Sequence, residues 1–354
     1  MDKDKNLEPL HAYAAEYKFN DFSALFAQLT SSLPEEEFLD AYLMRAQIKL
    51  FALDESFTAD LKKAGAINAV PRFPCLNKTW LPDSPNRLVV FGKNPGMIRR
   101  FLGCLAEGRE MLDRWYGETG QGMARQLESE ILYFMGDFSG ALDLAEKQYA
   151  RVPKPSAGGV MAQYVLFRGY LAARAPEKAE QCMLDMVKMA KACPECLAPY
   201  GIVRDWANLT TGWSGDTPRF HGIPDGKVQP FLDDRLTAIQ QGISQVSLLE
   251  TPFVEYAKQS YGDSCVMRQY YMDIFHAIYW FQTGELLQAK THFIKTYRIS
   301  SDSGLIMPFV EYGRQIIPLL KYMNDSGADC SPEWIAKVSS LAEQYEESIN
   351  RYRG

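Results

Sequence analysis

The chain contains one closely spaced pair of cysteines, Cys193 and Cys196, with Pro194 and Glu195 between them. Such a pair does redox chemistry in a βαβ setting, and it binds zinc when two further ligands lie nearby. Here the surrounding sequence has helical periodicity, and the chain contains no second pair with this spacing. The seven cysteines are odd in number and scattered, which is typical of reduced thiols. The sequence therefore favours neither a redox site nor a zinc site at this pair.

The four histidines of the chain lie far apart in the sequence and form no motif of the H-x-x-E-H kind. They are His11, His221, His276 and His292. His276 falls within an aromatic helical segment, where a histidine is more often a hydrogen-bonded core residue than a ligand. The sequence predicts no metal and no cofactor.

Motifs for nucleotide binding and nucleophilic catalysis are also lacking. Residues 222–227 resemble a phosphate-binding loop, but the glycines are one residue too close, and Val228 replaces the Ser or Thr that would hold magnesium. The chain has no catalytic serine elbow, and its carboxylates are predicted to lie on solvated helix faces. We therefore do not expect an enzyme.

Aromatic residues with polar tips are the remaining candidates for chemistry. Most are expected to fill space between helices, but helical-repeat proteins bind ligands on their inner surface, where Tyr and Trp suit a sugar or a peptide. The predicted ligand-binding residues are Tyr164, Tyr170, Trp213, Tyr271 and Tyr279. The alternative, that these tyrosines are core residues and that the loop around Trp213 is a connector, remains open.

The tyrosines fall mainly on the first helices of predicted helical hairpins. Residues 270–281 are apolar on nearly every side, which is typical of a helix packed between neighbours. After a break at 282–284, apolar residues recur at offsets of 3, 7 and 11, at Leu286, Ala289, Phe293 and Tyr297. This spacing predicts an amphipathic second helix, and thus the repeat unit of an α-solenoid.

The same pattern occurs earlier in the chain. A stripe at Leu127, Ile131 and Phe134 precedes a Gly-Asp turn at 136–137. The offsets of 3, 7 and 11 then recur at Phe138, Ala141, Ala145 and Tyr149. Glycine suits the turn and alanine suits a close approach of two helices. Residues 160–171 and 176–192 are predicted to form a third hairpin without the turn glycine. The predicted fold is an all-α, irregular tetratricopeptide-like α-solenoid of antiparallel helical hairpins.

The predicted solenoid is one continuous helical-repeat body over residues 1–354, because stacked repeats add length without adding separate cores. Two segments rich in proline or glycine, 65–91 and 212–227, are predicted to be irregular excursions. Further helices are predicted at 10–29, 95–116, 228–249, 251–261, 305–323 and 334–349. Residues 117–122 are predicted to form a loop.

The composition limits the classes of partner. The net charge of −6 and the pI near 5.4 give no electrostatic basis for binding nucleic acid or an anionic membrane. The N-terminus lacks a hydrophobic signal segment, and no apolar run approaches the ~20 residues that span a bilayer. We expect a cytoplasmic protein that does not contact membranes.

Several segments resemble one family. Residues 301–313 and 317–320, which follow the hairpin at Gly284, resemble the end of the helical-repeat sensor region of large LuxR-type transcriptional regulators related to the maltose regulator. Residues 334–345 are similar to the helix that precedes the DNA-binding domain there. Residues 84–91 and 136–138 are similar to the middle region of that family, so the resemblance covers most of the chain.

The resemblance implies recognition of a small-molecule inducer or a regulatory protein or peptide. Such regulators carry an ATPase domain before the repeats and a helix-turn-helix domain after them; this chain has neither, so it is expected to be an excised middle domain or a protein without both flanks. DNA binding is expected only through a helix-turn-helix domain absent from this chain. Two other hypotheses are a stand-alone peptide-docking scaffold and an all-α hydrolase or lyase. A desolvated pair of carboxylates in a cleft favours the enzyme, and an aromatic groove without such a pair favours sensing.

Overall fold

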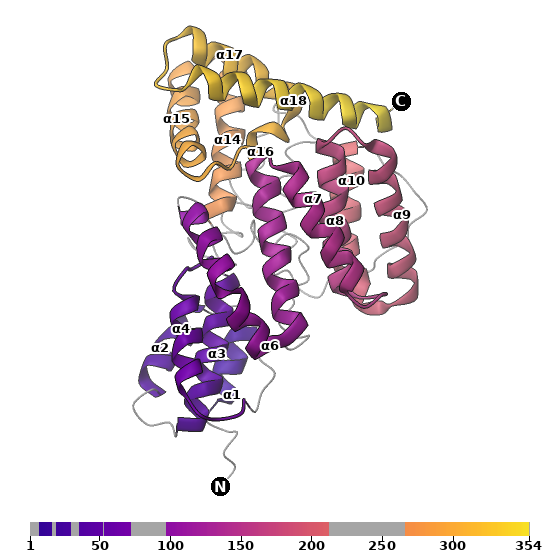
Figure 1. Cartoon of the computed structure of the whole chain (residues 1–354). Coiled ribbons are helices and arrows are strands. Elements are labelled where there is room, and N and C mark those ends of the chain that lie inside the picture. The colour runs from indigo at the N-terminus through magenta and orange to yellow at the C-terminus, as the bar shows by residue number, and fades with distance from the viewer. Residues whose placement is uncertain are drawn as a thin grey trace. The chain divides into compact units, whose positions relative to one another are not determined.

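The structure is a computed structural model that describes residues 7–15, 19–29, 35–51, 53–71, 97–211 and 266–353. Every regular element in these ranges is a helix (Figure 1). Neighbouring helices in the chain pack in pairs, so the predicted all-α fold of helical hairpins is confirmed. The predicted excursion at 212–227 lies outside the described residues, as does the 72–91 part of the excursion at 65–91.

Contacts divide the described residues into two compact units, and α6 (Ile98–Met135) contributes to both, with its boundary after Arg125. Each unit is described by itself. That residues 1–354 form one continuous body remains a prediction.

The first unit combines the N-terminal helices with the beginning of α6. The N-terminal helices are α1 (Glu8–Ala15), α2 (Phe19–Leu29), α3 (Glu35–Phe51) and α4 (Phe57–Ala66). Phe57 of α4 and Phe101 of α6 are fully buried, and their ring centroids lie 5.8 Å apart. Asp60 of α4 is buried too, and its charge is compensated by two cations of α3, because Arg45 approaches to 2.6 Å and Lys49 to 2.8 Å.

The predicted loop at 117–122 is wrong. Residues 118–122 continue α6, and the non-helical dihedral angles are those of Gly117, at φ 57° and ψ −145°. Glycine disfavours helix by only about 1 kcal/mol. Burial of the following residues, Met123 and Ala124, offsets such a local preference.

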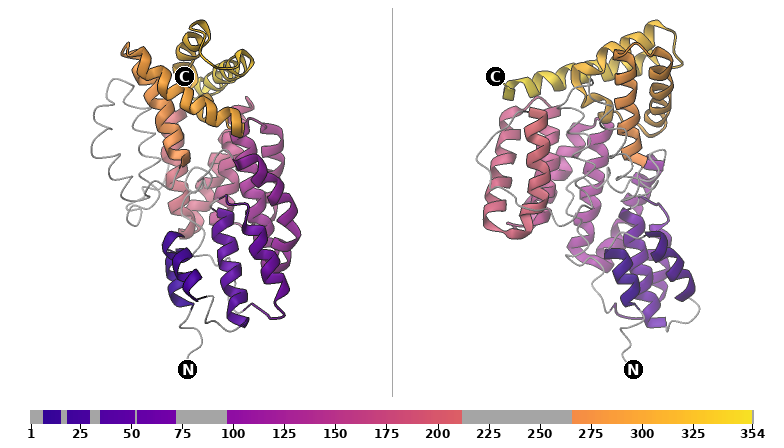
Figure 2. Two further views of the ribbon diagram at one scale, coloured as in Figure 1. Left: turned by 90° about the vertical axis from the view of Figure 1, so that its left-hand side faces the viewer. Right: turned by 180° about the vertical axis from the view of Figure 1, so that it is seen from behind.

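The second unit contains α6 from Gln126 onward and the helices that follow it. These are α7 (Phe138–Arg151), α8 (Ala157–Ala172), α9 (Pro176–Ala192), η4 (Pro194–Cys196), α10 (Leu197–Thr211), α14 (Val266–Gln282), α15 (Leu286–Ser303), α16 (Met307–Val310), η7 (Gly313–Gln315), α17 (Ile317–Asp325) and α18 (Pro332–Arg353). Helices α7 to α10 lie side by side, and α18 crosses the ends of α8, α9 and α10 (Figure 2).

The three predicted hairpins are present as α6/α7, α8/α9 and α14/α15. Gly136 and Gly284 occupy their turns with φ angles of 79° and 87°, which a glycine adopts without strain. In the third turn Arg174 takes the left-handed position, with φ 61°. The alanines predicted to permit close packing, Ala145 and Ala289, are fully buried.

The single helix predicted for 305–323 is wrong. The segment divides into α16, η7 and α17, because Gly313 has a φ of 57° and Pro318 cannot follow a continuous helical turn. Proline lacks an N–H and its ring clashes with the carbonyl four residues earlier, so Pro318 is accommodated in the first turn of α17. The last helix, α18, is confirmed, and the Ser331 hydroxyl caps it by accepting a hydrogen bond from Trp334 N at 3.2 Å.

Candidate functional site

A groove of about 410 Å³ lies between α7, α8 and α9. Helix α8 contributes Gln163, Leu166 and Tyr170, which are spaced by three and four residues and therefore share one face of that helix. Helix α7 contributes Glu146 and Tyr149 at the same spacing. Regular helical spacing therefore directs these side chains into one space, which we call the α8 groove.

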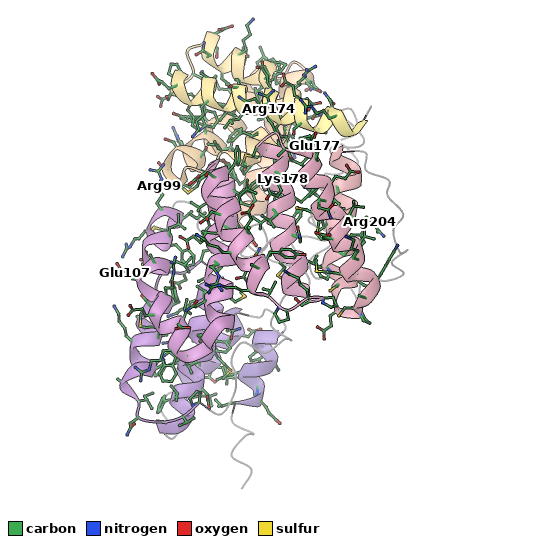
Figure 3. The ribbon with its side chains drawn as sticks, turned by 45° about the vertical axis from the view of Figure 1, so that its right-hand side comes forward. Arg99, Glu107, Arg174, Glu177, Lys178 and Arg204 are labelled. Atoms are coloured by element: carbon green, nitrogen blue, oxygen red, sulfur yellow. The ribbon has the colours of Figure 1, made fainter. Side chains whose placement is uncertain are left out.

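The opposite wall of the α8 groove is formed by α9. Lys178, Gln181, Cys182 and Asp185 of this helix face the groove, again at spacings of three and four residues. Pro176 begins the helix, so Lys178 lies in its first turn, close to the α8–α9 connection (Figure 3). The groove is thus bordered by residues that precede and follow a hairpin turn.

A hydrogen bond between Tyr170 and Glu146 joins the α8 side of the groove to the α7 side. The Tyr170 hydroxyl donates a hydrogen bond to Glu146 Oε1 at 2.5 Å, and Lys178 Nζ lies 5.2 Å from the centre of the Tyr170 ring. Partial burial raises the pKa of Tyr170 above its usual value, and the Glu146 carboxylate raises it further. Tyr170 is therefore a neutral hydrogen-bonding group near neutral pH.

Gln163 is the buried polar residue of the groove. Its side chain is 3% exposed, and its Oε1 atom has no hydrogen-bond partner among the described residues. An amide oxygen removed from water without a donor carries a desolvation cost of about 1–3 kcal/mol. A donor that reaches this atom from the groove would recover that cost.

The charges of the groove are balanced. Lys154 and Lys178 oppose Glu146 and Asp185, and the Lys154 ammonium lies 3.7 Å from the centre of the Tyr149 ring. Neither carboxylate is deeply buried: Glu146 is exposed, and Asp185 is half-buried and bonded to Lys188 at 3.0 Å. The arrangement suits a neutral or zwitterionic polar molecule better than a strong anion or cation.

Behind the groove, the other face of α8 carries a buried ion pair. Arg168 of α8 binds Glu311, and both side chains are almost inaccessible to solvent. Tyr133 and Tyr271 donate hydrogen bonds to the two oxygens of Glu311, at 2.7 Å and 3.0 Å. Burial by itself lowers the pKa of Arg168, but the Glu311 carboxylate outweighs it and holds that pKa well above its usual value. Arg168 therefore stays charged.

The predicted ligand-binding tyrosines are distributed over different environments. Tyr170 lies in the α8 groove. Tyr164 and Tyr271 are 1% exposed and flank the Arg168–Glu311 pair, with Tyr164 also packed edge-on against Trp206 at 5.7 Å. Tyr279 is half-buried beside Trp280, at 4.9 Å, and Trp213 lies outside the described residues. A ligand-binding role for all five residues remains a prediction.

The sequence interpretation did not identify Gln163 or the α9 wall. Gln163 is visible in the sequence as a polar position within an otherwise apolar helix, whereas Lys178, Gln181 and Asp185 have the appearance of ordinary solvated helix positions. The sequence could not show that the groove-lining faces of α8 and α9 lie opposite each other, because this depends on how α7, α8 and α9 cross.

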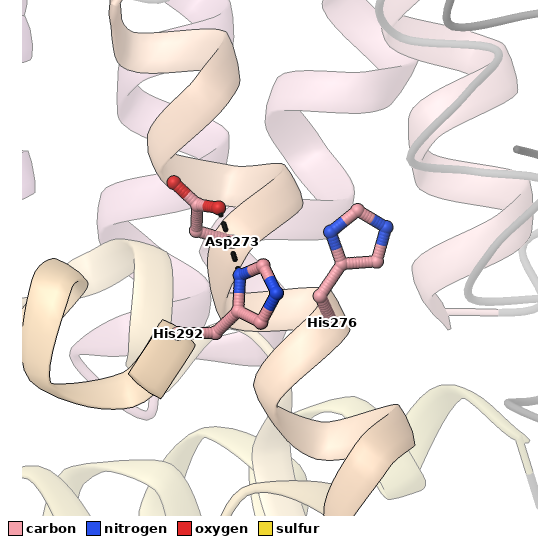
Figure 4. Close-up of side chains that lie close together, drawn as sticks. All are labelled: Asp273, His276 and His292. Carbon is pink, nitrogen blue, oxygen red and sulfur yellow. Dashed lines mark hydrogen bonds and ion pairs between the residues drawn. The ribbon is translucent and has the colours of Figure 1, made fainter. Parts of the chain in front are cut away.

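A second group of side chains has the composition of a metal site. Asp273 and His276 of α14 and His292 of α15 each place a potential ligand atom within 4.8 Å of the others (Figure 4). Asp273 is 2% exposed, whereas His276 and His292 are half-buried. The two histidines lie 16 positions apart in the sequence, and the α14/α15 turn at Gly284 brings them together.

Comparison with known proteins gives no family assignment: the sequence matches no protein-family model and has no significant match among curated proteins. In the described part of the chain, no helix has the length and apolar character needed to cross a membrane.

Proposed function

We propose that the chain is the ligand- or partner-sensing helical-repeat module of a LuxR-type transcriptional regulator, and that the α8 groove binds its small-molecule inducer. The observation that carries the proposal is Gln163, a buried residue that lines the groove together with Tyr170 and whose Oε1 atom lacks a donor among the described residues. A ligand donor at this atom recovers the free energy that its burial costs.

The side chains of the groove favour a small polar ligand such as a sugar or a short peptide. Tyr149 and Tyr170 offer ring faces for apolar ligand surfaces, and Gln163 and Gln181 offer amide hydrogen bonds. The volume of about 410 Å³ lies within the ~300–1,000 Å³ that is usual for small-molecule sites. The balanced charges disfavour phosphorylated compounds.

A ligand in this groove is well placed to influence α18. Helix α18 contacts α8, α9 and α10, and Arg174 in the α8–α9 turn lies 3.1 Å from Glu347 of α18. This exposed ion pair adds little stability by itself, but the packed helix contacts couple the position of α18 to that of α8 and α9. In the regulators that the sequence resembles, the corresponding helix precedes the DNA-binding domain. Movement of α18 is therefore the proposed output, in a protein that we place in the cytoplasm.

The peptide-docking scaffold remains the second candidate. Exposed groove residues such as Gln181 and Lys178 permit a longer peptide to extend beyond the groove. An all-α enzyme has less support, because Glu146 and Asp185 are solvated or paired rather than desolvated together.

The test is hydrogen exchange of α18 in the presence of compounds that bind. A panel of mono-, di- and oligosaccharides and of short neutral peptides is first screened by thermal shift against the whole chain. For each compound that stabilises the protein, amide exchange is then measured with and without it. Sensing predicts slower or faster exchange in α18 as well as protection in α8 and α9.

The alternatives give different results. A peptide scaffold predicts protection confined to the groove helices, with exchange in α18 unchanged. An enzyme predicts chemical conversion of the bound compound, which chromatography of the incubated mixture detects. Absence of any stabilising sugar or peptide contradicts the proposed ligand class.

A further inference from the structure

We propose that His276 and His292 bind a divalent transition-metal ion of the zinc class, and that Asp273 positions His292 for this role. The site lies between α14 and α15 and is separate from the α8 groove. Its ligands come from facing positions of one hairpin, so the turn at Gly284 fixes their relative placement.

The contact between Asp273 and His292 determines which nitrogen is available. His292 Nδ1 lies 3.0 Å from Asp273 Oδ1, so a neutral imidazole there donates its Nδ1 proton to the carboxylate. The lone pair is then on Nε2, on the side of the ring away from Asp273. A carboxylate that orients a histidine in this way is the usual outer partner of a metal ligand, and it also increases the basicity of the ligating nitrogen.

His276 supplies the second nitrogen. Its ring centroid lies 5.2 Å from that of His292, and Figure 4 shows nitrogens of the two rings facing each other. Zinc–imidazole bonds of ~2.0–2.1 Å place two nitrogens roughly 3.3 Å apart in a tetrahedral site. The ligand atoms of the two half-buried histidines lie within 4.8 Å of each other, so the rings must rotate to reach this spacing.

The ligand types select the ion. Imidazole suits Zn²⁺, Co²⁺, Ni²⁺ and Cu²⁺, whereas Mg²⁺ and Ca²⁺ prefer oxygen ligands. Two protein nitrogens leave two positions of a tetrahedral ion for water or for a group on a bound molecule. The site is therefore of the open kind, and it is accessible because the histidines reach the surface.

Lys295 gives the proposal a distinctive test. Its ammonium lies 2.6 Å from Asp273 Oδ2, so Asp273 contacts both a cation and His292, the histidine that it orients. This positive charge opposes the binding of a nearby dication. If the site binds a metal, removal of the Lys295 charge should therefore strengthen metal binding. If the network serves only to neutralise the buried Asp273 carboxylate, the same change should only destabilise the fold.

The experiment measures Zn²⁺ affinity by competition with a fluorescent chelator, and Co²⁺ binding by visible absorption, on the whole chain after removal of metals. Wild type should bind one ion. His276→Gln and His292→Gln should each lose at least about 100-fold in affinity, because loss of a ligand exceeds the ~10–100-fold cost of losing an outer partner. Asp273→Asn should lose about 10-fold while it retains the Co²⁺ spectrum, and Lys295→Gln should gain about 3- to 10-fold.

Two control variants exclude other donors. The double variant His11→Gln/His221→Gln removes the remaining histidines of the chain, and Cys193→Ser/Cys196→Ser removes the closely spaced thiols. Both should bind one ion with wild-type affinity. Circular dichroism in the presence of chelator verifies that every variant is folded before titration.

Three results overturn the proposal. The first is the absence of stoichiometric Zn²⁺ or Co²⁺ binding by wild type, and the second is unchanged affinity in folded His276→Gln and His292→Gln. The third is loss of binding in the cysteine double variant, which places the ion at Cys193 and Cys196 instead.

Discussion

Arg168 and Glu311, which are 143 positions apart in the sequence, form a buried ion pair in the second unit. Two tyrosine hydroxyls complete the hydrogen bonding of the Glu311 carboxylate, and aromatic rings of Tyr133, Phe134 and Trp206 surround the Arg168 guanidinium at 4.4–5.4 Å. The pair thereby joins α6, α8, α10 and α14 to the segment between α16 and α17.

Removal of one partner of this pair should be strongly destabilising. Arg168→Met leaves the Glu311 charge buried without a cation, which should lower the free energy of unfolding by about 3–5 kcal/mol. The double variant Arg168→Met/Glu311→Met should lose less than the single variant, because no uncompensated charge remains. Urea denaturation of wild type and the variants measures this. A loss below about 1 kcal/mol in Arg168→Met would show that the pair is not a major structural element.

Phe293 is the contact residue of the α14/α15 hairpin. It is fully buried, and its ring lies 5.9 Å from Phe309 and 6.2 Å from Trp334, which belong to α16 and α18. Phe293→Ala should therefore lower the free energy of unfolding by about 3–5 kcal/mol through loss of burial and creation of a cavity. Leu287→Ala is the control, because Leu287 in the same helix is 81% exposed and should change stability by less than about 0.5 kcal/mol. Equal melting temperatures for the two variants would contradict the packing described here.

The buried thiol of Cys182 should make the free energy of unfolding decrease as the pH rises into the alkaline range. Burial raises the pKa of this thiol to about 12 from its ordinary value of 9.0, so between these values the unfolded chain releases a proton that the folded chain retains. The stability that the protonated Cys182 thiol contributes is complete below pH 9 and declines as the pH rises toward 12. Relative to Cys182→Ala, wild type should lose about 1 kcal/mol of stability between pH 8 and pH 10. Parallel stability curves for the two proteins over this range would contradict the raised pKa.

The hairpins could be predicted from the sequence because their signals are local. Apolar spacing on α7 and α15, with glycines at 136 and 284, defines two helices and a turn without reference to the rest of the chain. Predictions from the sequence fail where the conformational preference of single residues competes with tertiary packing. Residues 118–122 are helical despite two glycines, and residues 305–323 are divided by Gly313 and Pro318.

The sites were less accessible to sequence reasoning. The residue type and helix of Tyr170 predict a ligand-binding role, but they predict the same role for Tyr164 and Tyr271, which the structure buries around Arg168. The direction in which a tyrosine points depends on its rotation about the helix axis relative to all neighbouring helices. Gln163, as a polar residue in an apolar helix, and the facing positions of His276 and His292 could be interpreted only after the helices were placed.

The most direct measurement of the central claim is isothermal titration with the sugar or peptide that gives the largest thermal shift in the panel. The proteins are wild type, Gln163→Leu, Tyr170→Phe and the control Tyr322→Phe, whose ring in α17 lies 5.5 Å from that of Phe281 and outside the α8 groove. Binding in the α8 groove predicts about 10-fold weaker affinity for Gln163→Leu and for Tyr170→Phe, since each loses a hydrogen-bonding group worth roughly 1.4 kcal/mol, with the control unchanged. Identical dissociation constants for all four proteins would place the ligand elsewhere and contradict the account.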